Sequence, residues 1–324
     1  MKRAGLARCL FCIALMTCFV GPAQPQGYPN RPVKFILPFA AGGGGDTFAR
    51  PLAQMLAEPL GQQVVIENIV GAAAIVGTEV AARAPADGYT FLMMSNAHAI
   101  NETLHPKLSY DLFRDFAPVT QLCTFSLVLV VHPSLPANSL SELIALAKSR
   151  PGKLAYASSG LGSIYHLPME LLKSMAGVDM LHVPYKSSGT ARADILSGQV
   201  QLMFDGLATM QPFVKTNRVR ALGISSARRS EAAPELPTIT EAALPGFEGD
   251  GWLGFAAPAG TPPAIVNRMQ AEIATILTRP QIRASYVAQA AEPIGSRPAQ
   301  YGAFLRQEVE KWGKVIRASG AKAE

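Results

Sequence analysis

Two glycine-rich segments carry the residues whose types and spacing are best suited to chemistry. The first, ILPFAAGGGGDTFAR at residues 36–50, runs from an apolar strand-like stretch through four glycines to Asp46 and a predicted helix. Glycine tolerates positive φ and close ligand approach, and the free N–H groups at a helix start attract small anions. The segment therefore predicts either an anion-binding loop, with Asp46 as the helix N-cap, or a tight connection between strand and helix.

This loop matches neither common nucleotide-binding motif. A P-loop ends in Gly-Lys-Ser/Thr, whereas here Gly45 is followed by Asp46 and Thr47. A dinucleotide-binding G-x-G-x-x-G would need its third glycine at Thr47. Basic residues form no stripe with aromatics beside them, so we expect no nucleic-acid binding either.

The second segment, YASSGLGSIYHL at residues 156–167, repeats the order of strand, small residues and helix. Two such loops facing one cleft could hold a carboxylate without any arginine, and Ser158, Ser159 and Ser163 would add hydroxyl donors. The nucleophile elbow G-x-S-x-G of serine hydrolases is absent, because the order here is Gly160-Leu161-Gly162-Ser163.

Several other polar residues have both a functional and a plain structural interpretation. His166 and Glu170 could share a metal, but no further His or Cys stands at useful spacing, so packing is favoured and we predict neither metal nor cofactor. Asp205 ends an apolar strand, where it either lines a ligand crevice or forms an Asp-Gly turn. In VPYKSSG, Tyr185 and Lys186 could both belong to a cleft loop. Alternatively, Tyr185 is a packing aromatic and Lys186 is a solvated charge.

The elements that must position these residues alternate between strand and helix. Apolar runs at 33–39, 62–68 and 89–95 predict strands, and 75–84 predicts a helix between the second and third. The alternation restarts after SLVLVVHP, and three helical segments close the chain at 262–277, 280–290 and 298–319. This order predicts an α/β fold with mostly parallel sheets flanked by helices.

The chain of 324 residues is long for one hydrophobic core. The final helices need a sheet to cover, and the first lobe is the one short of helices, so the chain is expected to cross between lobes near 120–129 and near 247–253. We therefore predict one lobe from 24–125 and 250–324, a second from 126–249, and a hinge that closes a cleft.

Residues 1–23 have the pattern of a cleaved secretory signal, with a cationic start and an apolar run too short to cross a bilayer. The sequence LMTC, which ends at Cys18, could belong to a lipoprotein signal, but Thr17 and Phe19 fit such a signal poorly. Without this segment the formal charge falls from +6 to about +3. Only Cys123 remains, in an apolar stretch typical of a buried thiol. We predict an exported, periplasmic protein.

A set of ordered motifs resembles the Bug-type receptors of tripartite tricarboxylate transporters over nearly the whole mature chain. The motifs are YPNRPVKFILPFAAGGGGD, ADGYTFLM, HAIN, DFAPVT, PGKLAYASSGLGS, VDMLHVPYKSSG, GQVQLMFD, RALGISSARR and FAAPAGTPPAIV. The resemblance implies a two-lobed periplasmic binding protein of the Venus flytrap type, without cofactor or catalysis, that serves a membrane transporter. Ligands in such a family are di- and tricarboxylates, amino acids or aromatic acids. We expect a monomer.

The resemblance also implies site residues. The two glycine loops would approach one carboxylate, and Asp205 with the Tyr185–Lys186 loop would line the distal pocket. The residues expected to contact the carboxylate are Phe39, Ala41, Gly42, Ser159, Gly160 and Ser163.

Three departures from the family pattern stand out. Relatives continue the second strand as Glu-Asn-Arg-Pro-Gly-Ala-Gly-Gly-Asn, whereas here ENIVGAAAI loses a charge, an amide and two glycines, which predicts a more apolar distal pocket if residues 69–75 border the cleft. Pro51 removes a helical donor. Gly206 replaces an amide that relatives often place after Asp205.

Two alternative functions stay open at this stage. An exported hydrolase would use Ser159 or Ser163 with His166, although no acid or oxyanion motif accompanies them. A sensory module that presents its bound ligand to a membrane regulator would share the same fold.

Overall fold

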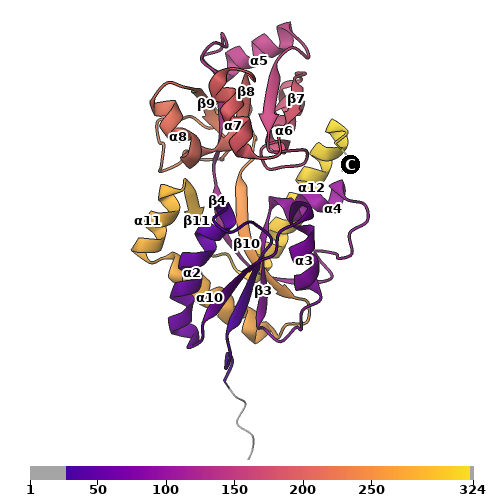
Figure 1. Ribbon diagram of the computed structural model, residues 1–324, viewed down its shortest axis with the longest axis vertical. Helices are drawn as coiled ribbons and strands as arrows, with labels where there is room; N and C mark the ends of the chain where they lie inside the picture. The colour runs from indigo at the N-terminus through magenta and orange to yellow at the C-terminus, as the bar shows by residue number, and fades with distance from the viewer. Residues whose placement is uncertain (1–26, 322–324) are drawn as a thin grey trace, which may run out of the picture.

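The computed structural model describes residues 27–321 and builds them into two sheet-based lobes (Figure 1). The predicted signal segment and Cys18 lie outside the described residues. Helices and strands alternate as the sequence predicts, and the α/β class is confirmed. Whether 24–125 with 250–324, and 126–249, are separate folding units stays a prediction.

The first lobe is built on a six-stranded sheet with the strand order β11-β4-β10-β3-β1-β2. Strand β1 pairs in parallel with β2 and β3, while β10 pairs antiparallel with β3 and β4. The sheet is therefore mixed rather than mostly parallel, because β10 enters from the other lobe and runs against its neighbours. The bounds are β1 (Val33–Leu37), β2 (Val64–Asn68), β3 (Thr90–Ser95), β4 (Phe116–Phe125), β10 (Gly251–Pro258) and β11 (Ala291–Pro293).

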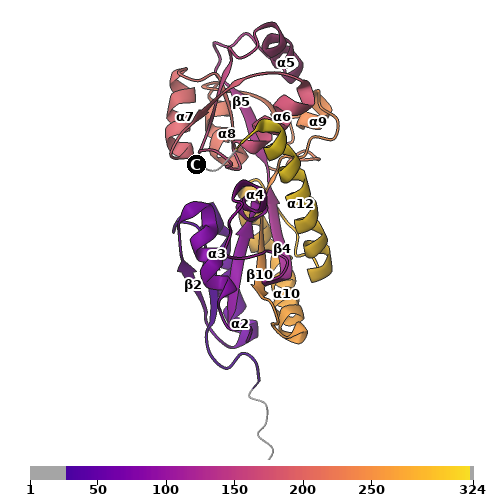
Figure 2. The same cartoon turned by 90° about the vertical axis from the view of Figure 1, so that its right-hand side faces the viewer.

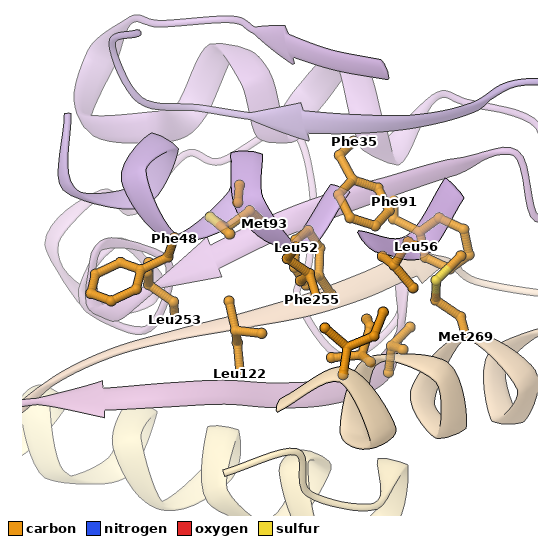
Figure 3. Packing of buried hydrophobic residues seen from close by; sticks show 14 of the residues in the cluster. Phe35, Phe48, Leu52, Leu56, Phe91, Met93, Leu122, Leu253, Phe255 and Met269 are labelled. Atoms are coloured by element: carbon orange, nitrogen blue, oxygen red, sulfur yellow. The ribbon is translucent and has the colours of Figure 1, made fainter. Parts of the chain in front are cut away.

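Apolar side chains from both faces of this sheet make the core of the first lobe. Figure 3 shows Phe35, Phe91 and Phe255 of the sheet packed in one cluster with Leu52 and Leu56 of one helix and Met269 of another. Pro51 lies inside the first of these helices without ending it. The helices of this lobe are α2 (Gly44–Leu60), α3 (Ile75–Ala82), α4 (Asn96–Leu104), α10 (Pro263–Leu277), α11 (Pro280–Ala288) and α12 (Pro298–Ser319), with a short 3₁₀ turn at Ala72–Ala74.

The second lobe is a five-stranded sheet in the order β7-β6-β8-β5-β9, with β5 antiparallel to both neighbours. Its strands are β5 (Leu127–Val131), β6 (Ala155–Ser158), β7 (Leu181–Pro184), β8 (Leu202–Gly206) and β9 (Arg220–Ile224). Its helices are α5 (Leu140–Ser149), α6 (Leu167–Ala176), α7 (Ser188–Ser197), α8 (Leu207–Lys215) and α9 (Ile239–Ala242).

Two chain crossings and one helix join the lobes. At the crossings, Gly249 N–H donates to Ser225 O (3.2 Å), and Leu127 N–H donates to Ser225 Oγ (2.8 Å). Helix α12 runs up from the first lobe to lie beside α6 of the second (Figure 2). Leu167 of α6 packs in the same cluster as Trp312 of α12. Within residues 27–321 no helix is both long and apolar enough to span a bilayer.

Candidate functional site

A cavity of about 980 Å³ lies between the lobes, large enough for a small molecule. Both glycine segments contribute to it. Among the described residues that line it, none is Asp, Glu, Lys or Arg. Any charge on a ligand here must therefore be matched by backbone groups, neutral side chains and helix ends.

The first glycine loop, residues 39–46, presents the start of helix α2 to the cavity. Gly43 is the N-cap and no side chain caps the helix. Gly43 N–H is used locally, donating to Ala40 O (2.9 Å). Gly44 and Gly45 line the cavity, and the first N–H groups of a helix have no acceptor within the helix. A Cβ at Gly44 would meet no atom within 4 Å, so this end of the helix faces open space.

The prediction that Asp46 caps the helix is wrong. Asp46 is the third residue of α2, and its buried carboxylate reaches back to accept the Gly42 N–H (2.9 Å), as well as Arg50 Nε (2.6 Å) and Asn68 Nδ2 (3.1 Å). Burial alone would raise the pKa of Asp46, but hydrogen bonds from Arg50, Gly42 and Asn68 outweigh it and lower that pKa. Asp46 thus braces the loop from within the helix.

Of the residues predicted in this loop, only Phe39 lines the cavity. Its ring covers Gly45, where a Cβ would come within 2.6 Å of Phe39 Cδ2. Ala41 and Gly42 are not part of the lining, and the Gly42 N–H is already donated to Asp46. Their contact with a ligand stays a prediction.

The second glycine loop, residues 158–163, faces the first from the other lobe. Ser159 and Ser163 line the cavity as predicted, while Gly160 does not. Gly162 adopts φ +70°, and a Cβ there would collide with Leu104 of the first lobe. Ser163 Oγ is buried and has no hydrogen-bond partner within residues 27–321, so its hydroxyl retains an unused donor.

Behind this loop lies a cluster of aromatic and polar side chains. Ser158 Oγ lies 2.7 Å from His182 Nε2 and accepts the Gly160 N–H (3.1 Å). His166 Nδ1 accepts the Gly162 N–H (3.1 Å), and its ring stacks on His182 with centroids 4.0 Å apart. Burial lowers the pKa of His166 to about 3 and that of His182 to about 4, so both rings are neutral. The cluster braces the loop.

The same geometry gives no support to the hydrolase alternative. Within residues 27–321, the His166 imidazole makes no hydrogen bond to the hydroxyl of Ser159 or Ser163, and its Nδ1 instead accepts the Gly162 N–H. In this loop, the serine whose hydroxyl meets a histidine is Ser158, and it is fully buried. In the same part of the chain, no group of three or more His, Cys, Asp or Glu side chains is placed to hold a metal ion.

The predicted distal residues lie next to the cavity rather than on it. Asp205 is fully buried and paired with Arg192, with Nε and Nη2 both 2.8 Å from its Oδ2. Tyr185 donates to Asp194 Oδ2 (2.6 Å), and Lys186 is exposed. Pro184 and Gly206, their neighbours in the chain, do line the cavity. The roles of Tyr185, Lys186 and Asp205 stay predictions.

Sequence reasoning missed a second uncapped helix start. Helix α8 follows Gly206, which is its N-cap without any side-chain cap, and Ala208 and Thr209 line the cavity beside it. The signal was present in the Asp-Gly pair at the end of an apolar strand, which marks the carboxyl edge of the sheet. Helix starts from both lobes, α2 and α8, thus point their partial positive charge at one cavity.

The segment after Asn68 also borders the cavity, through a turn of three successive alanines that we call the alanine turn, Ala72–Ala74. Their φ angles are 44°, 51° and 78°, a left-handed region that costs a residue with a Cβ about 1–2 kcal/mol. At the last two positions the family pattern has glycine, which adopts this conformation without strain. Ala72 and Ala73 line the cavity, and Ala74 is buried.

Hydrogen bonds from buried side chains hold the alanine turn. Asn101 Nδ2 donates to Ala73 O (2.9 Å), and Thr78 Oγ1 donates to Ala74 O (2.8 Å). His98 Nδ1 accepts the Ser95 N–H, so its proton lies on Nε2, which donates to Thr78 Oγ1 (3.0 Å). Burial lowers the pKa of His98 to about 4 and keeps it neutral. The turn is therefore fixed against α4.

Comparison with known proteins agrees with this architecture. Residues 48–321 match the family model described as tripartite tricarboxylate transporter family receptor. The chain is 36% identical to Protein BugT of Bordetella pertussis over 322 residues, which cover 98% of this chain and 99% of that protein.

Two solved structures are similar over most of their length. One is R. palustris Rpa4515 with adipate, at a TM-score of 0.80 and 36% identity, covering 91% of this chain and 99% of that one. The other is the periplasmic binding protein BugD, at a TM-score of 0.77 and 31% identity, covering 92% and 100%.

Proposed function

This chain belongs to the tripartite tricarboxylate transporter receptor family, and on that premise we propose that its two lobes close on a small carboxylate and deliver it to a membrane transporter of that type. It is a solute-binding receptor rather than an enzyme. Nothing in the comparisons favours a sensory module over a transport receptor. One relative was solved with adipate, a carboxylate, and this supports the ligand class.

A single observation carries the proposal. The cavity between the lobes is lined by the uncapped starts of α2 and α8 and by no Asp, Glu, Lys or Arg among the described residues. Free N–H groups at helix starts bind carboxylates through hydrogen bonds and the helix dipole, without a counter-ion. On closure, the ligand carboxylate would accept from the N–H groups at Gly44 and Gly45 and from the Ser163 hydroxyl.

A thermal-shift screen of the mature protein tests this function. We would compare carboxylic acids with their amides, which keep the shape and lose the charge. An acid present at about 100 times its Kd should stabilise the protein by about 2.7 kcal/mol, and its amide should have little effect. Equal shifts with acid and amide would contradict carboxylate binding.

A substitution at Gly44 tests where the carboxylate binds. Because a Cβ at Gly44 meets open space, Gly44→Leu should leave the melting temperature of the unliganded protein close to that of wild type. Its side chain would occupy the ligand's place, so binding of any acid found in the screen should be lost. Retained affinity in this variant would remove the α2 start from the site.

The cellular context is part of the proposal. We propose that the protein works in the periplasm after loss of its N-terminal segment, and that it is a monomer. The signal-like segment and the family support the first point, and a cavity formed within one chain supports the second. Cell fractionation and light scattering of the liganded protein test them, and a stable dimer would overturn the monomer.

A further inference from the structure

One side of the ligand cavity is made of aliphatic side chains. Ala72 and Ala73 of the alanine turn, Leu104 at the end of α4, and Leu161 of the second glycine loop all line it. Leu161 is 41% exposed, so its side chain is not covered by the rest of the protein. We refer to these four residues as the apolar wall.

Contacts with neighbouring residues place these four residues at one end of the cleft. Asn101 binds the Ala73 carbonyl, and Leu104 lies on the same helix three residues later. Leu104 in turn abuts Gly162, the residue after Leu161 in the opposite lobe. The wall therefore spans both lobes and would tighten around a ligand as they close.

The apolar wall has little to offer a second charged group. The Asn101 amide, which also lines the cavity, already donates to the Ala73 carbonyl. His105 is the only side chain of the described lining that can carry a positive charge. Among the described residues, the uncapped helix starts that line the cavity belong to α2 and α8. An ionised carboxylate without donors is strongly disfavoured in a closed cleft.

We propose that the ligand of this receptor is a monocarboxylic acid with an apolar body, and that the alanine turn selects it, an inference that rests on the proposed function. The carboxylate lies at the helix starts and the apolar body lies against Ala72, Ala73, Leu104 and Leu161. A dicarboxylate such as adipate would bring its second charge to the apolar wall.

Matched pairs of acids test the ligand class. We would measure calorimetric affinities for hexanoate against adipate, benzoate against terephthalate, and cyclohexanecarboxylate against cyclohexane-1,4-dicarboxylate. Hexanoate and adipate share one carbon chain, and in the other two pairs the diacid adds one carboxylate to the same ring. In any pair that binds, the monoacid should bind at least about tenfold more tightly, because the diacid buries a charge without partners.

The outcomes separate this inference from the function on which it rests. If diacids bind as tightly as monoacids or more tightly, the inference is wrong and the carboxylate receptor stands. If none of these six acids binds while another carboxylate stabilises the protein in the thermal-shift screen, the inference is overturned and the carboxylate receptor stands.

Variants of the alanine turn test the wall itself. Ala73→Gly removes one methyl group from the cavity and should weaken the best monoacid by about fourfold, the usual value of one buried carbon. Glycine accepts φ 51° without strain, so the melting temperature of the unliganded variant should be unchanged or higher. If the Ala73 methyl group had only a structural role, Ala73→Gly would lower the ligand affinity and the melting temperature together.

Ala74→Gly is the matched control. Ala74 shares the left-handed conformation at φ 78° but is buried and does not line the cavity. Its substitution should leave the monoacid affinity unchanged. Ala73→Asn should narrow the gap between monoacid and diacid, because asparagine tolerates the conformation and supplies a donor. Equal affinities in Ala73→Gly and wild type would overturn the role assigned to the turn.

Discussion

The two glycine loops face one cavity but are braced by opposite kinds of chemistry. The first is held by the ionised Asp46, which accepts from Gly42, Arg50 and Asn68. Neutral groups hold the second, where the Ser158 hydroxyl accepts the Gly160 N–H and the His166 ring accepts the Gly162 N–H.

The difference teaches how an anion site can be built without charged side chains at its surface. Asp46 is 2% exposed and its charge is already satisfied, so it fixes the helix start while pointing away from the cavity. In the second lobe, burial keeps His166 and His182 neutral. The first loop therefore presents Gly44 and Gly45 at the helix start, and the second presents Ser163, without a charged side chain of either loop in the cavity lining.

The largest effect expected from this comparison is the loss of the charged brace. Asp46→Ala leaves the Gly42 N–H and the Asn68 amide without their acceptor, which should reduce the free energy of unfolding by about 2–3 kcal/mol. Chemical denaturation at pH 7 measures it.

Asp46→Asn is the matched control, since it keeps an acceptor oxygen and should lose about half as much. A loss in Asp46→Ala no larger than that of an exposed substitution would show that the first loop is not braced by charge.

The second-largest expected effect is a difference between the two loops in how the free energy of unfolding changes at acidic pH. Burial, then the nearby His182 and Lys173, lower the folded pKa of His166 to about 3, against 6.5 unfolded. Between these values the unfolded chain binds more protons, so stability must fall as pH is lowered from 7. His166→Asn keeps an acceptor near Gly162 and has no group that titrates there. Between pH 7 and 5 this variant should therefore lose about 1–2 kcal/mol less free energy of unfolding than wild type.

Comparison with wild type at each pH isolates the histidine. Asp250, whose pKa burial raises to about 7, acts in the opposite direction and is common to both proteins. Asp46 has a lowered pKa and stays ionised over this range, so the first loop should not contribute. If the free energies of unfolding of variant and wild type change in parallel with pH, protonation of His166 does not destabilise the folded protein.

Most of the fold could be predicted from the sequence because apolar runs and turn residues are local signals. The terminal helices at 263–277, 280–288 and 298–319 lie within a few residues of their predicted bounds. The antiparallel entry of β10 and the packing of α12 on α6 could not be predicted, because both depend on contacts between residues far apart in the chain.

The sequence predicted the kind of site, two glycine-rich loops at one cleft, but only some of the residues that line it. Phe39, Ser159 and Ser163 line the cavity, whereas Gly44, Gly45 and the α8 start were missed. Backbone donors leave no side-chain signature, so the sequence could not show which residue of the loop faces the ligand. The alanine turn was visible only as a departure from the family pattern. Its carbonyls accept hydrogen bonds from Thr78, four residues after the turn, and from Asn101 of α4, and the second of these contacts joins residues far apart in the chain.

The smallest effect should separate a brace from a donor within one loop. Ser163 Oγ is buried without a partner, so Ser163→Ala should leave the stability of the unliganded protein unchanged or slightly higher and weaken the ligand by about fivefold, the value of one hydrogen bond. Ser158→Ala should do the reverse, because its hydroxyl accepts the Gly160 N–H and does not line the cavity. It should lose about 1 kcal/mol of stability with less effect on affinity. Chemical denaturation measures the stability of the two variants, and calorimetry measures their ligand affinity. If both variants change stability and affinity in the same way, Ser158 and Ser163 do not have separate structural and binding roles.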